Sequence, residues 1–573
     1  MTTNLRYEDK PWLKAYDPGV PESIEFEENL LHEYLETHSR SIPDHTALIF
    51  QGYRISFREF NNMADAFAAF LQSRGVKKGD AVAILLPNVI PCPVAFYAIM
   101  KIGAVAVMNN PLYADQELLH QFNDSKSTHL ITLDLLANRM IDLRPKTGIK
   151  SIVVTSIGDY LPFPKNILFP LVGRRKGLSA KVKTARNLYR WKEVIQEYSG
   201  SKPAAVPGGL GFQDIAMYQY TGGTTGVSKG AILTHGNLSK QTQQIKAWLP
   251  MFRDNPDEII LGALPFFHVM GLTVSMNFAI TQGWTNILVP KPQPAPLLEA
   301  MEKFRPTIAP LVPTMFIGVL NHPGTGKADL SSIKACVSGS APLPLDVIRG
   351  FEKKTGSVII EAFGMTESSP ATHVNPFSEG KRKVGSIGTP LPDTSCRIVD
   401  LGNPEKELPV GQPGEMVIKG PQVMLGYRNM PEETDKTITN GWLHTGDIAL
   451  MDEDGYFFIV DRKKDMIISG GYNVYPRDID EVLFTHPKVM EACAVGIPHP
   501  TRGEQIKAFV VPAPGQAPTE AELIAYCGEK LAKYKLPTQI EFIEELPKTN
   551  VGKVLRKDLR AMEAAKSAQR RAS

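Results

Sequence analysis

Helical and extended patterns of apolar residues alternate along most of the chain. After Ser56, the apolar positions Phe57, Phe60, Phe67 and Phe70 recur at helical spacing, which predicts a helix with one buried face. The segment VKKGD then leads into an apolar strand, AVAILLP. Further short apolar runs, THLITL, IKSIVVT, IILGALP, TNILVP and KACVSGS, are separated by helical segments. Because buried parallel strands read as continuous apolar runs, the pattern predicts an α/β architecture.

The C-terminal part of the chain shows a different order of elements. Two strands, YFFIV and IISG, flank the polar segment DRKKDM, and GYNVYPRDIDEVL contains a helix start. MEACAVGIP and IKAFVVPAPG read as strands, and EAELIAYCGEKLAKYKLP as a helix and its exit. We therefore expect a small α+β domain after Asp461, followed by a frayed polar tail, EAAKSAQRRAS.

One segment, residues 160–190, departs from the alternation. It reads YLPFPKNILFPLVGRRKGLSAKVKTARNLYR, with an apolar first half and a basic second half. The pattern predicts a surface insertion, since apolar and cationic side chains together can seat in the interface of an anionic bilayer. The alternative is a solvated loop whose apolar half packs on its own domain.

Composition and charge exclude several classes of protein. The 573 residues exceed what one hydrophobic core usually serves, and 63 basic against 60 acidic residues give no nucleic-acid-binding excess. Five scattered cysteines without a CxxC pair indicate neither a disulfide framework nor a zinc site. The sequence shows no secretory leader pattern and no run of about 18 uncharged apolar residues. We expect a cytoplasmic protein that does not span a membrane.

A loop rich in small residues, YTGGTTGVSKG, follows the strand-like IAMYQY. Glycines let backbone N–H groups approach an anion closely, threonines add hydroxyl donors, and Lys229 adds a positive charge. The loop therefore suits a polyphosphate, although it is not a Walker A sequence, because Val227 and Ser228 separate Gly226 from the lysine. A flexible turn is the alternative. The candidate phosphate-binding residues are Thr221, Gly222, Gly223, Thr224, Thr225, Gly226 and Lys229.

This loop resembles the signature of the AMP-forming superfamily of acyl-CoA synthetases, luciferases and peptide-synthetase adenylation domains. Six further segments resemble that family's motifs in the same order: LPFFHVMGL (264–272), SGSAPLP (338–344), EAFGMTES (361–368), GWLHTGD (441–447), DRKKDMIISGGYNVYP (461–476) and PKTNVGKVLR (547–556). Residues 440–464 are similar to the signature block of bacterial long-chain fatty acyl-CoA ligases, and the similarity extends upstream through 108–125. Phe457 and Phe458 depart from that block, where relatives commonly carry Leu and then a basic residue.

The resemblance implies a two-domain α/β fold. A large N-terminal adenylate-forming domain, residues 1–460, would combine layered sheets and helices with a distorted β-barrel. Residues 461–466 would form a hinge, and residues 467–573 a small mobile α+β domain that rotates between the two half-reactions.

The resemblance also implies an ATP site that both domains build. Phe363, which is Tyr in many relatives, would stack on adenine, and Asp447 and Arg462 would meet the ribose. Beyond the phosphate loop, the implied ATP-binding residues are Gly339, Ser340, Ala341, Glu361, Ala362, Phe363, Gly364, Met365, Thr366, Asp447, Ile459, Arg462 and Lys553.

Four residues carry the implied chemistry. Glu367, with Thr224, would bind Mg²⁺, which prefers carboxylate and phosphate oxygens. Lys553 would reach the α-phosphate from the small domain, and His268 would lie beside the carboxylate being activated. Thr221 completes the implied catalytic set. Without the resemblance, Glu367 would be interpreted as a solvated turn residue and His268 as a core histidine.

Coenzyme A and the acyl chain have their own implied contacts. The Gly470–Gly471 turn would line the pantetheine channel, where a side chain would obstruct the thiol. The implied coenzyme A contacts are Lys463, Lys464, Ser469, Gly470, Gly471 and Tyr472. The implied acyl contacts are His268, Val269, Gly271, Leu272, Trp284 as a gate, and Gly339, although the same residues could simply pack a helix.

We therefore expect a long-chain fatty acid CoA ligase that forms an acyl-adenylate with release of pyrophosphate, and then acyl-CoA with release of AMP. Its partners would be fatty acid, ATP and CoA, with Mg²⁺ as cofactor and no nucleic acid. A homodimer and a peripheral contact with anionic membrane are additional hypotheses. The alternatives are a medium-chain, aryl or cinnamoyl-type acid CoA ligase, a stand-alone carrier-loading adenylation enzyme, a luciferase-like oxygenase and a non-catalytic acyl-binding relative.

Overall fold

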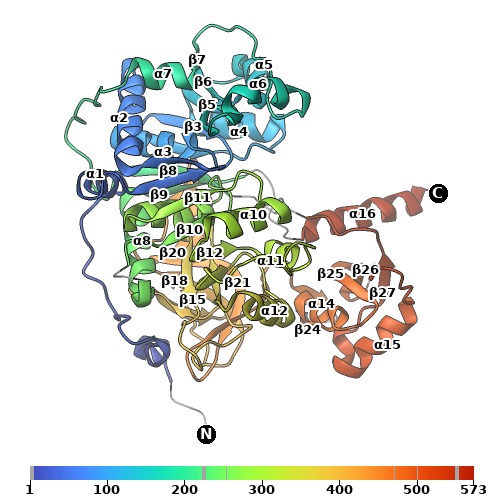
Figure 1. Cartoon of the computed structure of the whole chain (residues 1–573). Helices are drawn as coiled ribbons and strands as arrows, with labels where there is room; N and C mark the ends of the chain where they lie inside the picture. The colour runs from blue at the N-terminus through green and yellow to red at the C-terminus, as the bar shows by residue number, and fades with distance from the viewer. Residues whose placement is uncertain are drawn as a thin grey trace.

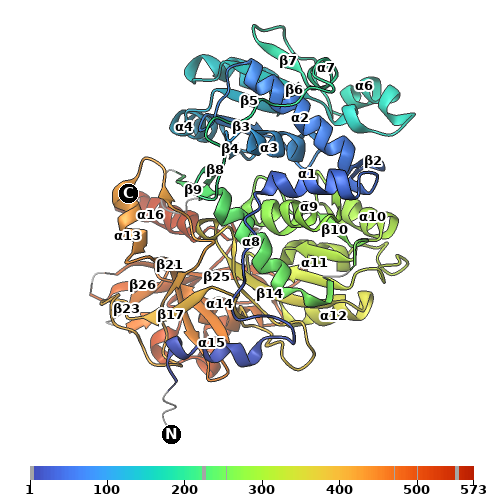
Figure 2. The ribbon, with the colours of Figure 1, turned by 90° about the vertical axis from the view of Figure 1, so that its left-hand side faces the viewer.

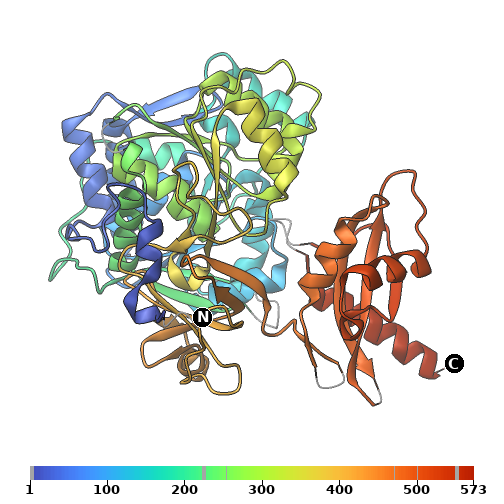
Figure 3. The same ribbon diagram turned by 90° about the horizontal axis from the view of Figure 1, so that it is seen from below.

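The computed structural model describes residues 5–221, 228–252, 255–469, 472–499, 501–548 and 554–572. Four β-sheets organise these residues, three in a large N-terminal body and one in a smaller C-terminal body beside it (Figure 1). The view from below shows the C-terminal body, drawn in orange and red, as a separate lobe (Figure 3). This two-body architecture agrees with the predicted α/β multidomain fold.

An eight-stranded sheet lies in the upper part of the large body (Figure 1), and its order is β19-β9-β8-β4-β3-β5-β6-β7. Pairing is parallel from β8 through β7 and antiparallel at β8–β9 and β9–β19. The strands are β3 (Ala81–Leu85), β4 (Val105–Met108), β5 (His129–Leu133), β6 (Ser151–Thr155), β7 (Leu188–Arg190), β8 (Ile215–Tyr220), β9 (Gly230–Thr234) and β19 (Gly426–Tyr427). Its helices are α2 (Phe57–Ser73), α3 (Pro91–Lys101), α4 (Asp115–Ser125), α5 (Asp134–Leu143), α6 (Lys165–Arg175) and α7 (Trp191–Glu197).

The helix predicted after Ser56 is α2. Its first turn is closed by a capping box, in which the Ser56 hydroxyl accepts from the Glu59 N–H at 3.2 Å and the Glu59 carboxylate accepts from the Ser56 N–H at 2.7 Å. The four phenylalanines of the predicted face are buried. The helical spacing of apolar residues therefore predicted both the helix and the face that it buries.

A nine-stranded sheet forms the second layer, in the order β16-β15-β14-β13-β12-β10-β11-β1-β2. Its strands are β1 (Thr46–Phe50), β2 (Tyr53–Ser56), β10 (Ile259–Gly262), β11 (Thr285–Leu288), β12 (Ile308–Leu311), β13 (Ala335–Ser338), β14 (Val358–Gly364), β15 (Ala371–Val374) and β16 (Thr389–Pro390). Its helices are α1 (Leu31–Ser41), α8 (His235–Trp248), α9 (Phe278–Gln282), α10 (Pro294–Phe304), α11 (Pro313–Leu320), α12 (Leu345–Thr355) and a π-helix (Gly271–Asn277). Strands β10, β12, β13 and β14 are parallel, so their carboxyl ends share one edge, where α/β sheets commonly bind ligands.

A five-stranded antiparallel sheet completes the large body, with order β17-β18-β21-β20 and β22 paired to β21. It comprises β17 (Ser395–Val399), β18 (Gly414–Lys419), β20 (Ile438–Thr439), β21 (Trp442–Met451) and β22 (Phe457–Arg462), with α13 (Pro431–Thr437) before β20. Within the described residues, the strand pairings do not close this sheet into the distorted barrel that the resemblance implied. Seven short 3₁₀ segments complete the described elements: Tyr7–Asp9, Pro11–Ala15, Arg144–Lys146, Ile157–Tyr160, Pro250–Phe252, Thr366–Ser368 and Lys533–Lys535.

The C-terminal body has its own sheet and its own cores. Its elements are β23 (Ile467–Ser469), β24 (Tyr472–Val474), α14 (Pro476–Phe484), β25 (Val489–His499), β26 (Gly503–Pro512), α15 (Glu520–Lys530), β27 (Gln539–Phe542) and α16 (Arg556–Ala572). The expectation of a frayed tail is wrong for the described residues, because α16 continues to Ala572. Leu559 and Glu563 are buried against the sheet, and Glu563 pairs with Lys507 at 2.5 Å, so packing holds the helix in place.

Within the part of the chain that the structure describes, no helix is long and apolar enough to cross a bilayer.

Candidate active site

One cavity of about 2260 Å³ lies where the three sheets of the large body meet the C-terminal body. Its walls include the ends of β8, β13 and β14, the β21–β22 sheet and the residues that follow β22. Lys548, Leu555 and Lys557 also line it, so the small body faces the cavity with the residues on either side of 549–553. Figure 2 shows β8 and β9 between the upper strands β3 to β6 and the strand β21 below them.

Most sequence-predicted site residues within the described ranges line this one cavity. These are Thr221, Lys229, His268, Val269, Gly339, Ser340, Ala362, Phe363, Gly364, Met365, Thr366, Glu367, Arg462, Lys463 and Lys464. The structure places nine others outside its lining: Gly271, Leu272, Trp284, Ala341, Glu361, Asp447, Ile459, Ser469 and Tyr472. The remaining predicted residues, Gly222, Gly223, Thr224, Thr225, Gly226, Gly470, Gly471 and Lys553, lie outside the described residues.

The two ends of the phosphate loop are held together by the β8–β9 pair. The Thr221 N–H donates to the Lys229 carbonyl at 2.9 Å, which continues the antiparallel ladder to the base of the loop. On α4, the His120 ring nitrogen Nε2 is 2.9 Å from the Ser228 carbonyl oxygen. The Lys229 ammonium pairs with the Glu433 carboxylate and lies 5.0 Å from the centre of the Tyr427 ring. The predicted phosphate-binding lysine is therefore fixed at the cavity wall.

Glu367 is the candidate metal ligand. It is only 8% exposed, and its Oε1 accepts a hydrogen bond from the Tyr427 hydroxyl at 2.6 Å. Among the described residues there is no group of three or more His, Cys, Asp or Glu side chains that could hold a metal by themselves. A single carboxylate beside the candidate polyphosphate residues would fit Mg²⁺, which keeps several waters and binds through one or two carboxylates plus substrate phosphates.

The residues predicted to form the adenine slot lie at the end of β14 and in the turn after β13. Phe363 lines the cavity, and its ring centre lies 6.2 Å from that of His373. Gly364 has no room for a side chain, because a Cβ there would lie 2.0 Å from the Pro370 carbonyl oxygen. This close approach of β14 and β15 sets the position of Phe363.

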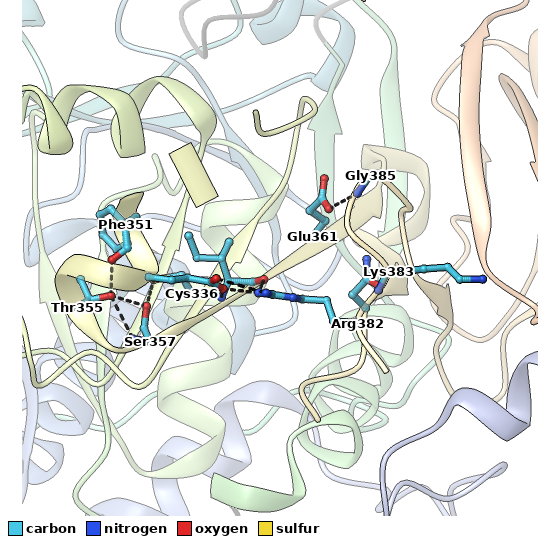
Figure 4. Close-up of polar contacts among 11 residues, drawn as sticks. Cys336, Phe351, Thr355, Ser357, Glu361, Arg382, Lys383 and Gly385 are labelled. Carbon is cyan, nitrogen blue, oxygen red and sulfur yellow. Dashed lines mark hydrogen bonds and ion pairs between the residues drawn. The ribbon is translucent and has the colours of Figure 1, made fainter. Parts of the chain in front are cut away.

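Glu361 was predicted in this slot, but its side chain binds protein instead. Its carboxylate accepts from the Gly385 N–H at 2.8 Å, which ties the loop after Arg382 to β14 (Figure 4). Burial raises the pKa of the Glu361 carboxyl, while the Gly385 hydrogen bond opposes that shift. Arg382 of the same loop donates to the Ile359 carbonyl at 2.6 Å and pairs with Glu352 (Figure 4). These contacts hold the loop after Arg382 against β14, the strand that carries the predicted adenine contacts.

Asp447 and Arg462, the predicted ribose contacts, are register partners on β21 and β22. The Arg462 Nε lies 2.6 Å from the Asp447 Oδ1, and Asp447 is buried while Arg462 reaches the cavity. The arginine therefore stands between the aspartate and the cavity. Ile459, on the same strand, gives its carbonyl to the Arg477 guanidinium at 2.7 Å and does not line the cavity.

The predicted hinge is anchored to both bodies. Lys463 pairs with Glu415 of β18 at 2.9 Å, and Asp465 pairs with Arg560 of α16 at 2.8 Å. Burial is the main cause that lowers the pKa of Lys464. Of the predicted coenzyme A contacts, Lys463 and Lys464 thus line the cavity, whereas Tyr472 is 58% exposed on the small body, stacked at 4.7 Å on Tyr534.

His268 is the first of the predicted acyl contacts along the chain. It faces the cavity, and burial among protein atoms lowers the pKa of its imidazole, which is therefore neutral at pH 7. The π-helix follows directly, and Gly271 permits it, because a Cβ there would lie 2.3 Å from the Pro265 carbonyl oxygen. Such π-helical turns occur often at functional sites.

Three predicted acyl contacts occupy other positions. Leu272 is fully buried, and Gly271 packs against backbone rather than the cavity. Trp284 does not act as a gate in this geometry, since it is buried beside Phe252 and Phe278 and donates its indole N–H to the Asn255 carbonyl at 3.0 Å. In this geometry these three residues pack inside the protein, as the alternative to acyl binding predicted.

Tyr427 and Glu433 are cavity-lining residues that sequence reasoning missed. They contact Glu367 and Lys229, which lie 60 and 204 positions away in the chain. The segment LGYRNMPEET gives no periodic or motif signal for these contacts, because they depend on the pairing of β19 with β9. Only the tertiary structure could identify them.

Comparison with known proteins agrees with this geometry. The family model "AMP-binding enzyme" matches residues 35–428, and "AMP-binding enzyme C-terminal domain" matches residues 478–553. The fold and the site thus define an adenylate-forming enzyme. The chain belongs to the AMP-binding enzyme family.

Individual relatives match over nearly their full length. A long-chain-fatty-acid–CoA ligase of Bacillus subtilis is 43% identical, covering 96% of this chain and 97% of the relative. One of Escherichia coli O6:H1 is 39% identical with 96% and 98% coverage, and a feruloyl-CoA synthase of Amycolatopsis is 34% identical with 91% and 96% coverage. The crystal structure of ATP-bound MatB from Rhodopseudomonas palustris has a TM-score of 0.80 and 30% identity, covering 93% of this chain and 99% of that one.

Proposed function

We propose that the protein is a long-chain fatty acid CoA ligase of the AMP-forming type. One observation carries the proposal: a single cavity joins the candidate polyphosphate and metal residues, Lys229 and Glu367, to a long apolar lining. The 43% and 39% identity to long-chain-fatty-acid–CoA ligases supports the same acyl class.

In the first half-reaction, a carboxylate oxygen of the acid attacks the α-phosphorus of ATP, and the bond to the β-phosphate oxygen breaks. Thr221, Lys229 and the intervening loop would bind the departing pyrophosphate, and Glu367, with Thr224, would hold Mg²⁺, which neutralises phosphate charge. Lys553 would stabilise charge on the α-phosphate oxygens. Asp447 and Arg462, which pair at 2.6 Å between Oδ1 and Nε, would meet the ribose hydroxyls.

In the second half-reaction, the CoA sulfur attacks the acyl carbon, AMP leaves, and the thiol proton must be accepted. His268 is suited to lie beside this step because its neutral imidazole keeps one acceptor nitrogen. We place the domain boundaries at residues 1–460, 461–466 and 467–573, with the middle segment as the hinge. Rotation there would bring Ser469, Gly470, Gly471 and Tyr472 to the cavity in place of Lys553.

The acyl chain has an apolar wall below His268. Its members come from α8, the π-helix, β13 and the sheet edges of the second layer: Ile245, Trp248, Leu249, Val274, Val337, Ile360, Val374 and Leu391. Burial of each methylene contributes about 0.8 kcal/mol, so a site of this kind favours long chains. A panel of acids from octanoate to stearate, with ferulate as the aryl alternative, tests the class by pyrophosphate release. Highest kcat/KM for C14 to C18 acids is expected, and a preference for ferulate or octanoate would contradict the proposal.

Replacing Val274 by tryptophan should shift the chain-length profile toward shorter acids. Val274 lies on the π-helix and lines the cavity, so a bulky ring there removes space for terminal methylenes. Each excluded methylene should reduce kcat/KM by roughly fourfold, from about 0.8 kcal/mol. The matched control is Ile317→Trp on the exposed side of α11, which should leave the profile unchanged. An unaltered profile in Val274→Trp would remove Val274 from the acyl site.

The thiol that receives the acyl group distinguishes a CoA ligase from an enzyme that loads a carrier protein. Thioester formation with free CoA, and none with a holo-carrier protein, is the expected result. We further propose a cytoplasmic location, and the homodimer hypothesis is checked separately by sedimentation equilibrium.

We also propose that α6 docks on anionic lipid. Three apolar side chains here are 78%, 64% and 74% exposed: Phe163, just before the helix, and Ile167 and Leu171 on it. Leu168 and Phe169 line the cavity. Three basic residues, Arg174, Arg175 and Lys176, end the helix, and each can contribute about 1 kcal/mol near an anionic surface. An exposed apolar face beside cations and above an acyl cavity suits a lipid-facing surface.

Vesicle co-sedimentation tests this surface. The protein should bind phosphatidylcholine vesicles that contain phosphatidylglycerol, and bind less at high salt, because the cationic contribution is screened. The variant Ile167→Glu/Leu171→Glu should weaken the partition by roughly a hundredfold, since each of the two apolar side chains loses about 1.5 kcal/mol of burial. Leu345→Glu, an exposed leucine on α12, is the matched control. Equal binding by both variants would contradict docking through α6.

A further inference from the structure

Residues 426–437, here called the α13 arm, lie beside the phosphate loop. The β19 part of the arm pairs with β9 at Gly426–Ile232 and Tyr427–Ala231. The Arg428 N–H also donates to the Gly230 carbonyl at 2.8 Å. Since β9 begins directly after Lys229, these bonds hold α13 next to the lysine that the proposed function assigns to polyphosphate.

The arm presents a carboxylate to that lysine. Glu433 Oε1 pairs with Lys229 Nζ, and both side chains reach the cavity, with exposed fractions of 38% and 27%. The hydrogen bond from Lys229 lowers the pKa of the Glu433 carboxyl. Glu433 is therefore anionic at neutral pH and occupies the position from which a phosphate oxygen would bind the ammonium.

The arm does not need this ion pair to keep its shape. The Tyr427 N–H donates to the Thr434 hydroxyl at 2.8 Å, and that hydroxyl donates to the Met430 carbonyl at 3.0 Å. Together with the β9 pairing, these bonds hold α13 through backbone groups and the Thr434 hydroxyl. None of them uses the Glu433 side chain, whose carboxylate pairs with Lys229.

We propose that the Glu433 carboxylate competes with pyrophosphate for the Lys229 ammonium and so promotes pyrophosphate release between the two half-reactions. The inference rests on the proposed function, because it takes Lys229 as a polyphosphate ligand. A carboxylate beside bound pyrophosphate repels it and offers the ammonium another partner as the product departs. The carboxylate thus lowers the affinity for the product and leaves Lys229 paired after release.

Isothermal titration calorimetry with magnesium pyrophosphate, without acid or CoA, measures this effect on the full chain. Glu433→Gln and Glu433→Ala should each bind pyrophosphate roughly two- to tenfold more tightly than the unmodified protein, as expected for removal of a partly exposed ion pair and a like charge. Glu432→Gln, an exposed neighbour on α13, is the matched control and should leave the affinity unchanged. Product inhibition by pyrophosphate in the complete reaction should strengthen by the same factor.

A double substitution separates this inference from the proposed function. Lys229→Gln should weaken pyrophosphate binding, and adding Glu433→Gln to it should tighten binding by less than Glu433→Gln does in the unmodified protein, because competition for the ammonium is gone and only the like-charge repulsion is relieved. Loss of affinity in Lys229→Gln together with unchanged affinity in both Glu433 variants would overturn only the proposed competition by Glu433. Unchanged affinity in Lys229→Gln would overturn both the proposed competition by Glu433 and the placement of polyphosphate at Lys229.

Discussion

Replacing Glu367 by glutamine is expected to slow acyl-adenylate formation by a factor of about 10² to 10³, because the proposed Mg²⁺ ligand loses its charge. The amide keeps the size of the side chain, and its oxygen can still accept from the Tyr427 hydroxyl, which bonds Glu367 at 2.6 Å. The loss therefore reports on charge at the metal site rather than on packing. ATP–pyrophosphate exchange with palmitate measures it.

The control for this substitution is Glu379→Gln, an exposed glutamate outside the cavity, which should retain full exchange activity. The apparent Mg²⁺ requirement of Glu367→Gln should also rise. Exchange activity within a few-fold of the unmodified protein at low Mg²⁺ would show that Glu367 does not hold the metal.

Replacing Lys553 by alanine is expected to have the second large effect, and on one half-reaction only. Adenylate formation should fall by about 10² to 10³, since a positive group that stabilises transition-state charge on the α-phosphate is removed. Thiolysis of supplied palmitoyl-adenylate by CoA should change by less than about threefold, because the proposed rotation takes the lysine away from the site for that step. Single-turnover assays of each half-reaction measure the two rates separately.

Lys533→Ala on the small body is the matched control, since it removes an exposed lysine away from the cavity and should alter neither rate. Equal losses in both half-reactions for Lys553→Ala would contradict the proposal that Lys553 acts in adenylate formation only. Lys553 itself lies outside the described residues, and its role rests on the resemblance together with the cavity position of Lys548, Leu555 and Lys557.

Local chemistry made much of the fold predictable. The apolar runs THLITL and IKSIVVT became the buried strands β5 and β6, and the period after Ser56 became α2 with its capping box. The ordered motifs identified residues from three sheets that line one cavity, among them Thr221, Glu367 and Arg462. These features follow from local periodicity or from motifs whose meaning does not depend on distant partners.

Features that depend on tertiary contacts were not predictable in the same way. Glu361 and Trp284 have the residue types expected for a site, but bind the Gly385 N–H and the Asn255 carbonyl instead. The C-terminal residues are polar enough to suggest a frayed end, yet the burial of Leu559 and Glu563 keeps them helical. Tyr427 and Glu433 reach Glu367 and Lys229 only because β19 pairs with β9, a strand far away in the sequence.

The most direct test of the central claim is the product balance of the complete reaction. Palmitate, ATP, Mg²⁺ and CoA are incubated with the protein, and palmitoyl-CoA, AMP and pyrophosphate are quantified together by mass spectrometry and nucleotide chromatography. The account predicts equal amounts of the three products, with ADP absent and AMP formation dependent on the acid. Formation of ADP and phosphate, or AMP formation with ferulate but not with palmitate, would contradict it.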